Sequence, residues 1–511
     1  MPAYRFFDNG RSPEDIWESL QRRAGLSAPR PVERRWAVYD SFDWRLHAAG
    51  LALVRRGADL SLEPLAGGDP LAVERIEGEP RLAEGLPEGA LRDRLAPLLD
   101  IRAVMAHIRG LESRCDADLL DERGKVVVRI GRVRLGVEPA GELTFWEVQP
   151  LRGFADAADR LIALLEELDL SPREAPLPRL MERLKAPPGF YRAKPSVRLD
   201  PAMRTDLALQ AVMAALVETA RANEGGILAD LDTEFLHDFR VAIRRTRSLL
   251  SQVKEALPEA DEARFKDALR RVGKSTNDLR DLDVYLLHAD DYRRMLPESL
   301  RPAIEPLFAL LTRRRGAALK MVRRNLRSVD YRKIMDAWQA FLETPVPATD
   351  MTPTGGRPIG EVARECIAGR YRKIVRKGSR IGPDSPDEDF HALRIDCKKL
   401  RYLLEMFGSV LPRKAVKKAV KRVKGLQDVL GRLQDIHVQT HMLHHFADEL
   451  AAEGQADHRT FLAVGALMGW LTEERIGVRD AFDSRFARFA EARQIRRMAR
   501  LTHSTEAELR S

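Results

Sequence analysis

Short stretches of alternating apolar and polar side chains dominate roughly the first 170 residues of the chain. This period-two pattern, enriched in β-branched residues, predicts half-buried strands. Only two segments, 13–24 and 156–168, have the apolar spacing of a helix. Because so few helices separate the strands, we expect an α+β domain with an antiparallel sheet over residues 1–170. The predicted strands are residues 34–39, 52–56, 60–65, 125–135 and 143–148.

Two proline-rich segments divide the rest of the chain. Residues 171–198 are rich in proline, which predicts a semi-rigid linker. Beyond them the apolar periodicity is helical, and a second proline-rich break at 344–358 lies near the middle of this region. Each part has room for about four helices. We therefore expect an all-α domain over residues 199–505, composed of two helical bundles in tandem at about 199–344 and 359–505.

The helical region contains an internal repeat. The stretch HDFRVAIRRTRSLL, beginning at His237, returns as HALRIDCKKLRYLL, beginning at His391, an offset of 154 residues. The register then holds for almost fifty residues, which indicates duplication of one structural unit. Further matched positions are Leu257-Pro258 with Leu411-Pro412, and Leu279, Asp281 and Val284 with Leu433, Asp435 and Val438.

Placed on a helix, each copy of the repeat has a cationic stripe beside an apolar arc. A solvated helix face usually mixes charges of both signs, whereas no Glu interrupts these cations. Like charges three and four residues apart repel, and a bound polyanion would remove that repulsion. In the first copy the apolar arc holds Phe239, Ile243, Thr246 and Leu250; the stripes hold His237, Arg240, Arg244, Arg247, His391, Arg394, Lys398 and Arg401, flanked by Arg245 and Lys399.

Two alternatives to ligand binding remain open for this stripe. The carboxylates of Asp281, Asp283 and Asp435 could pair with its cations inside the bundle. His237 and His391 lie at the edge of the apolar face, where a histidine is as often packed as it is bound to a ligand. Arginine nevertheless suits phosphate, because its planar fork can bind two oxygens at once.

The net charge of +9 is unevenly placed. Residues 1–195 hold 30 of the 86 Lys and Arg and 32 of the 77 Asp and Glu, which leaves 56 against 45 in the remainder. The net charges are therefore −2 and +11, and the excess in the helical part indicates an anionic partner or an Arg-rich solvated surface. Clusters outside the stripe add Arg314, Arg372, Lys373 and Lys421 as candidate phosphate ligands.

Other compositional features indicate a reducing compartment. Three cysteines at unrelated spacings provide neither a disulfide framework nor a metal pair. The first residues lack the pattern of a signal peptide, and no uninterrupted apolar run is long enough for a membrane span. We expect a cytoplasmic protein without a membrane partner, associated with polyphosphate granules if polyphosphate is its ligand.

The paired H-x-x-R-x-x-x-R/K-R/K-x-R helices, with the LRDLDV and LQDIHV segments, resemble the CHAD domain, the conserved-histidine α-helical domain. The resemblance covers about residues 199–505. It implies two pseudo-symmetric four-helix bundles with a basic groove between them, which bind inorganic polyphosphate without catalysis or cofactor. The residues that match its binding motif are His237, Arg240, Arg244, Arg245, Arg247, His391, Arg394, Lys398, Lys399 and Arg401.

The segment from Tyr39 to Gly57 resembles two strands of the CYTH, or triphosphate tunnel, fold, through Tyr39-Asp40 and the run L-x-x-x-G-L-x-L-x-R ending at Arg55. The resemblance spans about residues 3–170 and implies a tunnel-like sheet. The enzymes of that family open with an E-x-E-x-K strand whose carboxylates hold the metal. Here the first strand, Ala3 to Phe7, has no acidic residue, so we expect a degenerate tunnel in which Arg55 and Arg129 could still bind an anion.

Three functions follow from these patterns. The first is a non-catalytic polyphosphate-binding protein. The alternative is a triphosphatase that uses Mg²⁺ or Mn²⁺ in the N-terminal domain, with the helical domain as a tether for polyphosphate. The third, a nucleic-acid binder, is less favoured, because aromatic residues make up only 6% of the chain and few of them interleave the basic stripes.

Overall fold

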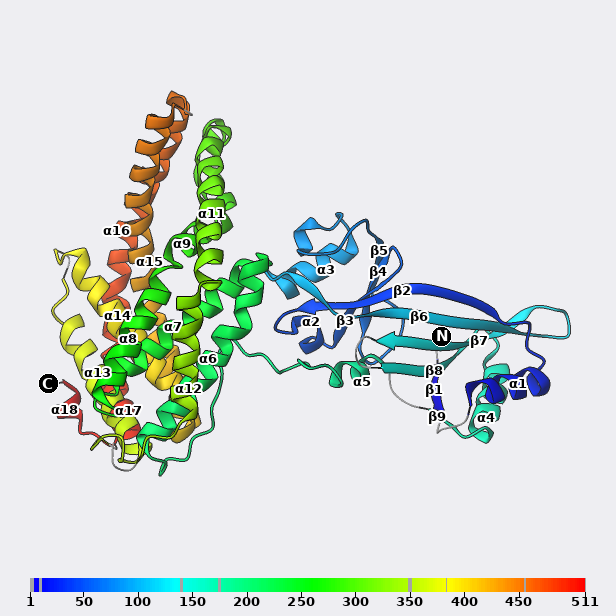
Figure 1. Cartoon of the computed structure of the whole chain (residues 1–511). Coiled ribbons are helices and arrows are strands. Elements are labelled where there is room, and N and C mark those ends of the chain that lie inside the picture. The colour runs from blue at the N-terminus through cyan, green and yellow to red at the C-terminus, as the bar shows by residue number, and fades with distance from the viewer. Residues whose placement is uncertain are drawn as a thin grey trace. The chain divides into compact units, whose positions relative to one another are not determined.

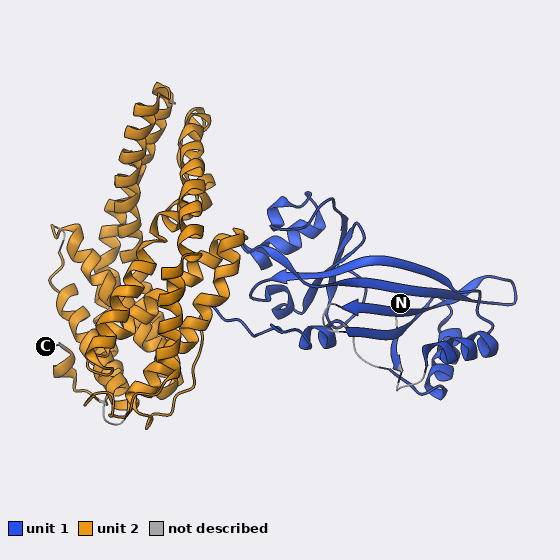
Figure 2. Ribbon diagram, in the orientation of Figure 1, with its two compact units in different colours: residues 1–193 blue, residues 194–511 orange. Residues whose placement is uncertain are grey.

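The structure is a computed structural model that describes residues 4–8, 12–137, 141–172, 176–347, 352–382, 384–454 and 456–510. The chain forms two compact units, Met1–Ala193 and Lys194–Ser511 (Figure 2). The first is built around one antiparallel sheet, and the second is helical (Figure 1).

All nine described strands of the first unit belong to one sheet. Their order is β5-β4-β3-β2-β6-β7-β8-β1-β9, and every described pairing is antiparallel. The order ends at two strands of four and three residues, β5 and β9, which limits the exposed edge at each side. The strands are β1 (Tyr4–Asp8), β2 (Arg30–Ser41), β3 (Leu51–Arg56), β4 (Asp59–Pro64), β5 (Ala72–Arg75), β6 (Val104–Leu120), β7 (Val126–Val137), β8 (Gly141–Pro150) and β9 (Leu170–Pro172).

Short helices cover the apolar parts of this sheet. Helices α1 and α4 pack on a cluster around Trp146, α3 on a cluster around Leu53, and α5 on a cluster around Phe145. Each helix contributes leucines to the face that it covers, which removes that face from water. The helices are α1 (Pro13–Ala24), α2 (Arg45–Ala48), η1 (Ala83–Gly85), α3 (Ala90–Leu99), α4 (Ala155–Glu167) and α5 (Pro176–Glu182).

Parts of the sequence-based prediction differ from the structure, and others fall outside the residues that it describes. The expected linker 171–198 begins with the end of β9, which pairs with β1, and contains α5, whose Leu180 is buried against the sheet. Strand β6, which pairs with both β2 and β7, was not predicted because charged residues interrupt its alternation. Ala3 of the predicted first strand and residues 348–351 of the second proline-rich break lie outside the described residues.

The Tyr-Asp pair that begins the CYTH-like segment has a structural role. The Asp40 carboxylate is buried and accepts hydrogen bonds from the N–H groups of Leu46 (2.9 Å) and His47 (2.8 Å), so it fixes the start of α2. Burial raises the pKa of Asp40 to about 6, although these N–H donors favour its charged form. Gly50 follows α2 with a φ of 76°, a conformation that favours glycine.

The second unit consists of helices and short connections. None of the helices in the described part of the chain combines the length and apolar composition that a membrane crossing requires. The helices are α6 (Thr205–Ala229), α7 (Thr233–Gln252), α8 (Glu259–Lys274), α9 (Asn277–Leu287), α10 (Ala289–Met295), η2 (Glu298–Ile304), α11 (Glu305–Leu326), α12 (Val329–Glu343), α13 (Ile359–Gly378), α14 (Asp387–Met406), η4 (Gly408–Val410), α15 (Arg413–Glu453), α16 (His458–Phe489), α17 (Ala492–Thr502) and α18 (Glu506–Arg510).

The sequence repeat is also a repeat of structure. Helices α7 and α14 carry the two basic motifs, and both of their ends differ by the same 154 residues that separate His237 from His391. Helix α6 also begins 154 residues before α13, although α6 has 25 residues and α13 has 20. The copies differ beyond the motif, because α8 and α9 are separate helices, whereas the matching residues of the second copy lie within the single helix α15.

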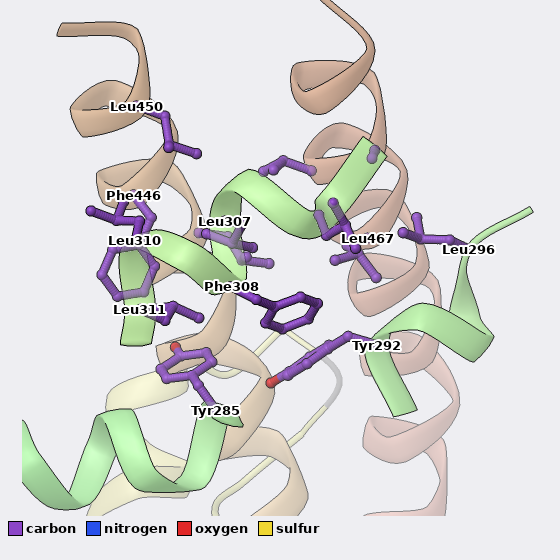
Figure 3. Packing of buried hydrophobic residues seen from close by; sticks show 14 of the residues in the cluster. Tyr285, Tyr292, Leu296, Leu307, Phe308, Leu310, Leu311, Phe446, Leu450 and Leu467 are labelled. Atoms are coloured by element: carbon purple, nitrogen blue, oxygen red, sulfur yellow. The ribbon is translucent and has the colours of Figure 1, made fainter. Parts of the chain in front are cut away.

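A shared hydrophobic core joins helices of the two repeats. Tyr285, Tyr292 and Phe308 from the first repeat pack with Phe446 and Leu467 from the second (Figure 3). The Tyr285 and Phe446 rings meet edge to face, with centroids 5.8 Å apart. The two repeats are therefore held as one body by α9–α11 on one side and α15–α16 on the other.

Truncation of this core should destabilise the helical unit. We expect Phe446→Ala to lower the free energy of unfolding by about 3–5 kcal/mol, because Phe446 is fully buried and its removal leaves a cavity. Urea unfolding followed by circular dichroism at 222 nm measures this change. Leu462→Ala on α16, where the leucine is 60% exposed, is the control and should change stability by less than about 0.5 kcal/mol. Equal losses in the two variants would contradict the assignment of the core.

Candidate functional site

The site is built where α7 and α14 cross in antiparallel directions. The Arg245 guanidinium of α7 forms an ion pair with Glu405 and lies over the Tyr402 ring of α14, 5.5 Å from the ring centroid. Seven residues further along α7, the Gln252 amide donates to the Lys399 carbonyl at 3.4 Å. Since the partner number falls as the α7 number rises, the cationic stripes of the two helices run in opposite directions beside each other.

Two adjoining cavities open along this crossing. One, of about 1200 Å³, is lined by the matched residues His237 and His391, Arg240 and Arg394, and Arg244 and Lys398. The other, of about 1170 Å³, is lined by Arg247 of α7 and Lys399 of α14, with residues of α8. Arg244 and Lys398, equivalent positions in the two repeats, line both cavities. We call the two cavities together the groove.

Cations outnumber carboxylates in each part of the groove. The cavity with the histidines has seven Lys and Arg residues against three Asp, and its neighbour has seven against four Asp and Glu. Several of the carboxylates are already paired, as Asp291 is with Arg294 and Asp267 with Arg270. The groove therefore retains a positive potential, which its low-dielectric walls concentrate.

Arg240 lines the groove and also forms hydrogen bonds with the end of α8. One of its terminal nitrogens donates to the Gly273 carbonyl at 3.0 Å and to the Thr276 hydroxyl at 2.6 Å, at the end of α8. Burial lowers the pKa of Arg240 to about 10, and the neighbouring guanidiniums of Arg244 and Arg280 add to this effect while Asp281 opposes it. Arg240 is thus positioned by α8, and its charge is destabilised where it lies.

The equivalent cations of the second repeat are less firmly held. Arg394 lies 3.6 Å from a carboxylate oxygen of Asp435, and burial lowers its pKa. Burial also lowers the pKa of Lys398 to about 7, with repulsion from Arg394 and Arg244 as the next causes. An anion bound between these side chains would reverse that shift, because it favours the charged form of each.

The two histidines have different neighbours. His391 is exposed and its Nδ1 forms a hydrogen bond with the Gln434 side chain, a residue whose counterpart in the first repeat is Arg280. His237 is half-buried beside Glu234 and Asp238, and their potential ligand atoms lie within 4.8 Å of one another. This is the one group of metal-ligand type in the described residues, but the Arg280 guanidinium 3.9 Å from Glu234 disfavours a cation there.

Some residues predicted for the site lie outside the groove. Arg245 is only 3% exposed and is committed to Glu405, and Arg401 lies 3.6 Å from the same carboxylate. Arg314 on α11 pairs with Glu449 and also contacts His445. The others line neither cavity: Arg372 and Lys373 on α13, the latter 3.7 Å from Asp396, and Lys421 on α15, which lines a separate pocket.

Other groove cations were not predicted from the sequence. They come from α8, α9, α10, α15 and the connection that follows α7, and all but Arg270, whose counterpart is Lys424, lack a basic counterpart in the other repeat that would have singled them out. Arg280 lies between Leu279 and Asp281, two positions that recur in the second repeat. Its place within this matched segment is the sequence signal that could have identified it. These residues are Arg280, Arg294 and Arg432 in one cavity and Lys254, Lys266 and Arg270 in the other.

The proposed internal partners of the stripe account for only part of it. Asp435 lies beside Arg394, and Asp281 stabilises the charge of Arg240. Asp283 instead pairs with Arg315 of α11, 2.7 Å away. Arg244, Arg247 and Lys398 form no ion pair with a carboxylate within the described residues. The centre of the groove therefore consists of cations without carboxylate partners.

The first unit does not bring Arg55 and Arg129 together. Arg55 donates to the carbonyls of Gly57 and Gly78, and Arg129 lies 3.4 Å from Asp118. The strand register aligns both Arg55 and Arg109 with Ala37, so these two arginines lie on the same face of the sheet. Arg129 is aligned with Asp118 and shares the face of Asp118. Arg109 and Asp118 are nine residues apart on β6, so they point to opposite faces. The predicted pair is not one anion site.

Carboxylates on one face of this sheet are neutralised by arginines. Glu147 accepts from Arg5 and Arg114, both at 2.8 Å, and although burial opposes it, Arg114 and Arg5 lower the pKa of Glu147. Glu112 is similarly paired with two arginines, Arg34 and Arg56. A metal ion would have to displace these guanidiniums to reach the carboxylates.

Comparison with known proteins gives one family match. Residues 211–444 match the family model described as CHAD domain. Two uncharacterized proteins of Mycobacterium tuberculosis, MT2285 (strain CDC 1551 / Oshkosh) and Rv2226 (strain ATCC 25618 / H37Rv), are each 28% identical over 235 residues, 44% of this chain and 42% of the relative. The chain thus spans less than half the length of these curated relatives.

Two solved structures are similar in part. The crystal structure of the CHAD domain from the plant Ricinus communis is 23% identical, with a TM-score of 0.48, and covers 58% of this chain and 96% of that domain. PptA from Streptomyces chartreusis is 17% identical, with a TM-score of 0.44, and covers 56% of this chain and 99% of that protein.

The lowered pKa of Lys398 gives a pH-dependent stability difference. Below about pH 7 the folded protein carries this destabilised charge in full, and between about pH 7 and the ordinary lysine pKa of about 10.4 only the unfolded chain keeps the proton. The destabilisation is therefore full below pH 7 and falls as pH rises. We expect Lys398→Met to be more stable than the wild type at pH 6.5, by a margin that shrinks by pH 9.5.

Urea unfolding of both proteins across this pH range measures that margin. Lys333→Met on α12, where the lysine is exposed, is the matched control and should give a margin that does not change with pH. A pH-independent margin for Lys398→Met would show that Lys398 is an ordinary solvated lysine.

Proposed function

Residues 211–444 of this chain form a CHAD domain, and from that premise we propose that the protein binds inorganic polyphosphate in the groove between its two repeats. The proposal rests on the positions of Arg244 and Lys398 where the two cavities adjoin. These matched residues line both cavities, so a linear ligand could run from one cavity into the other past both side chains. Such a ligand must be long, narrow and negatively charged along its length.

Electrostatics favour a polyanion over a single small anion. The pKa values of Arg240, Arg394 and Lys398 are all lowered, chiefly by burial and also by neighbouring cations. A ligand that carries regularly spaced charges offsets this repulsion along the whole groove and releases its own counterions on binding. Arginine forks can each bind two oxygens of a phosphate unit, and Lys398 adds a point charge between them.

The aromatic residues of the groove favour polyphosphate over nucleic acid. Tyr285 and Tyr292 line the groove, but their rings are buried in the core that joins the repeats (Figure 3). Trp470, which is 38% exposed, is the one aromatic lining this cavity that has substantial exposure in the described structure. Proteins that bind single strands stack successive bases on several such rings, and the groove does not supply a series of them.

Neutralising the centre of the groove should weaken polyphosphate binding. We expect Arg244→Ala with Lys398→Ala to lower affinity for long-chain polyphosphate by about 10- to 100-fold at low salt, and to reduce the slope of log K against log [salt] by about 1.4, since two phosphate contacts are lost. Binding can be measured by fluorescence anisotropy of labelled polyphosphate at several salt concentrations. This pair is preferable to Arg240, whose removal would also uncap α8.

Arg332→Ala with Lys333→Ala on α12 is the matched control. It removes the same charge from exposed positions outside the groove and should leave the affinity within about twofold. Competition with single-stranded RNA at fixed salt separates the two polyanions. Displacement of polyphosphate by RNA at equal phosphate concentration would contradict the proposal, as would equal effects of the two double variants.

We also propose that the first unit is not a metal-dependent triphosphatase. The support is the pairing of Glu147 with Arg5 and Arg114, and of Glu112 with Arg34 and Arg56, which already neutralises these carboxylates. We expect the wild-type protein, incubated with tripolyphosphate and Mg²⁺ or Mn²⁺, to release phosphate no faster than the Glu147→Gln variant. A colorimetric phosphate assay measures both rates. Metal-dependent release that Glu147→Gln abolishes would establish the triphosphatase instead.

A further inference from the structure

A second basic pocket lies on the first half of α15, apart from the groove. Its larger chamber, of about 680 Å³, lies between α15, the end of α16 and α17. Seven Lys and Arg residues line it against a single carboxylate, Asp428, and they include Lys421. A second chamber, of about 360 Å³, adjoins it, because Lys418, Arg422 and Arg497 line both. None of these residues lines the groove.

The cations of this pocket stand without carboxylate partners in the part of the chain that the structure describes. Within the described residues, Lys418, Lys421, Arg422 and Arg497 form neither an ion pair nor a side-chain hydrogen bond. Clusters of arginine elsewhere in the same unit are paired, as on α11, where Arg313, Arg314 and Arg315 each contact a carboxylate. The unpaired state is therefore not the general condition of basic residues on this surface.

The ordinary explanations for surface cations account for little of the cluster. A basic residue in the last turn of a helix interacts favourably with the helix dipole, which applies to Arg488 at the end of α16. It does not apply to Lys418, Lys421 and Arg422, which lie well inside α15, near enough in sequence to repel one another. A multiply charged anion in the chamber would remove this repulsion.

The smaller chamber has a different chemistry. Met498 and Leu501 of α17 and Val423 of α15 form its apolar wall, while Arg422 and Arg497 stand at its boundary with the larger chamber. We infer that the two chambers bind one organic oligophosphate, with the phosphates among the cations and a compact apolar or aromatic group against Met498. A nucleoside triphosphate has this combination of parts, and the site is independent of polyphosphate binding in the groove.

Isothermal titration of the full-length protein with ATP and with tripolyphosphate, without metal, tests this inference. The groove variant Arg244→Ala/Lys398→Ala provides the background, so that binding in the groove is weakened and the α15 pocket dominates the signal. We expect ATP to bind about tenfold more tightly than tripolyphosphate, since burial of an aromatic group readily supplies the roughly 1.4 kcal/mol that a tenfold difference requires. Equal affinities would show a plain anion site, and no binding of ATP would overturn the inference altogether.

Three variants on this background locate the ligand. Arg422→Gln with Arg497→Gln should weaken ATP binding at least about tenfold, since each charged contact to phosphate is worth a substantial part of that change. Arg413→Gln with Arg496→Gln, exposed positions of the same two helices outside both chambers, is the matched control and should leave ATP binding unchanged. Ala419→Trp, which fills the apolar chamber, should weaken ATP binding but not tripolyphosphate binding.

Controls distinguish this inference from the proposed function. In an otherwise wild-type groove, Arg422→Gln/Arg497→Gln should retain full affinity for long-chain polyphosphate, and circular dichroism should show unchanged helicity. Loss of ATP binding in the groove variant itself, with retention in the pocket variant, would place the nucleotide in the groove and overturn the inference. Failure of polyphosphate binding in the wild type would contradict the proposed function and leave the ATP result to be judged separately.

Discussion

The antiparallel packing of α7 on α14 is the contact on which the groove depends. It brings together the same face of two copies of one helix, and the cations of that face must then share a small volume. Repulsion and burial both oppose this arrangement, as the lowered pKa of Lys398 shows. The Arg245–Glu405 pair at the crossing and the apolar core around Phe446 hold the repeats together against it. Packing energy thus maintains an unfavourable charge distribution.

Such an arrangement is expected where a ligand supplies the missing counter-charge. Arg244 and Lys398 line the same cavities and form no ion pair with a carboxylate of the described residues, and burial beside other cations destabilises the charge of Lys398. A polyanion bound there would favour the charged form of Lys398, which would then take up a proton near neutral pH. Ligand binding, protonation and stability would thus be coupled through one side chain, and the same argument does not extend to Arg245, whose charge is already compensated inside the fold.

The sequence predicted the repeat and the positions of its apolar and cationic arcs because both depend on local helix geometry. Phe239, Ile243 and Leu250 are buried as the arc requires. It could not predict that Arg245 is buried, since that depends on the partner helix and on Glu405, 160 residues away. Strand β6 was missed for a related reason: Glu112 and Arg114 lie on one face of the sheet, where paired charges replace the apolar side chains that reveal a strand.

The two repeats have diverged in a way that gives equivalent arginines of the groove unequal surroundings. In the first, the break between α8 and α9 gives Arg240 backbone and hydroxyl acceptors at Gly273 and Thr276. In the second, α15 continues through the matching position, and Arg394 lies 3.6 Å from a carboxylate oxygen of Asp435. Arg240 is thus held by neutral acceptors while burial lowers its pKa to about 10, whereas Arg394 has a carboxylate beside it. Duplication supplied the symmetry of the groove, and the helix break of one copy gives the equivalent arginines different surroundings within one cavity.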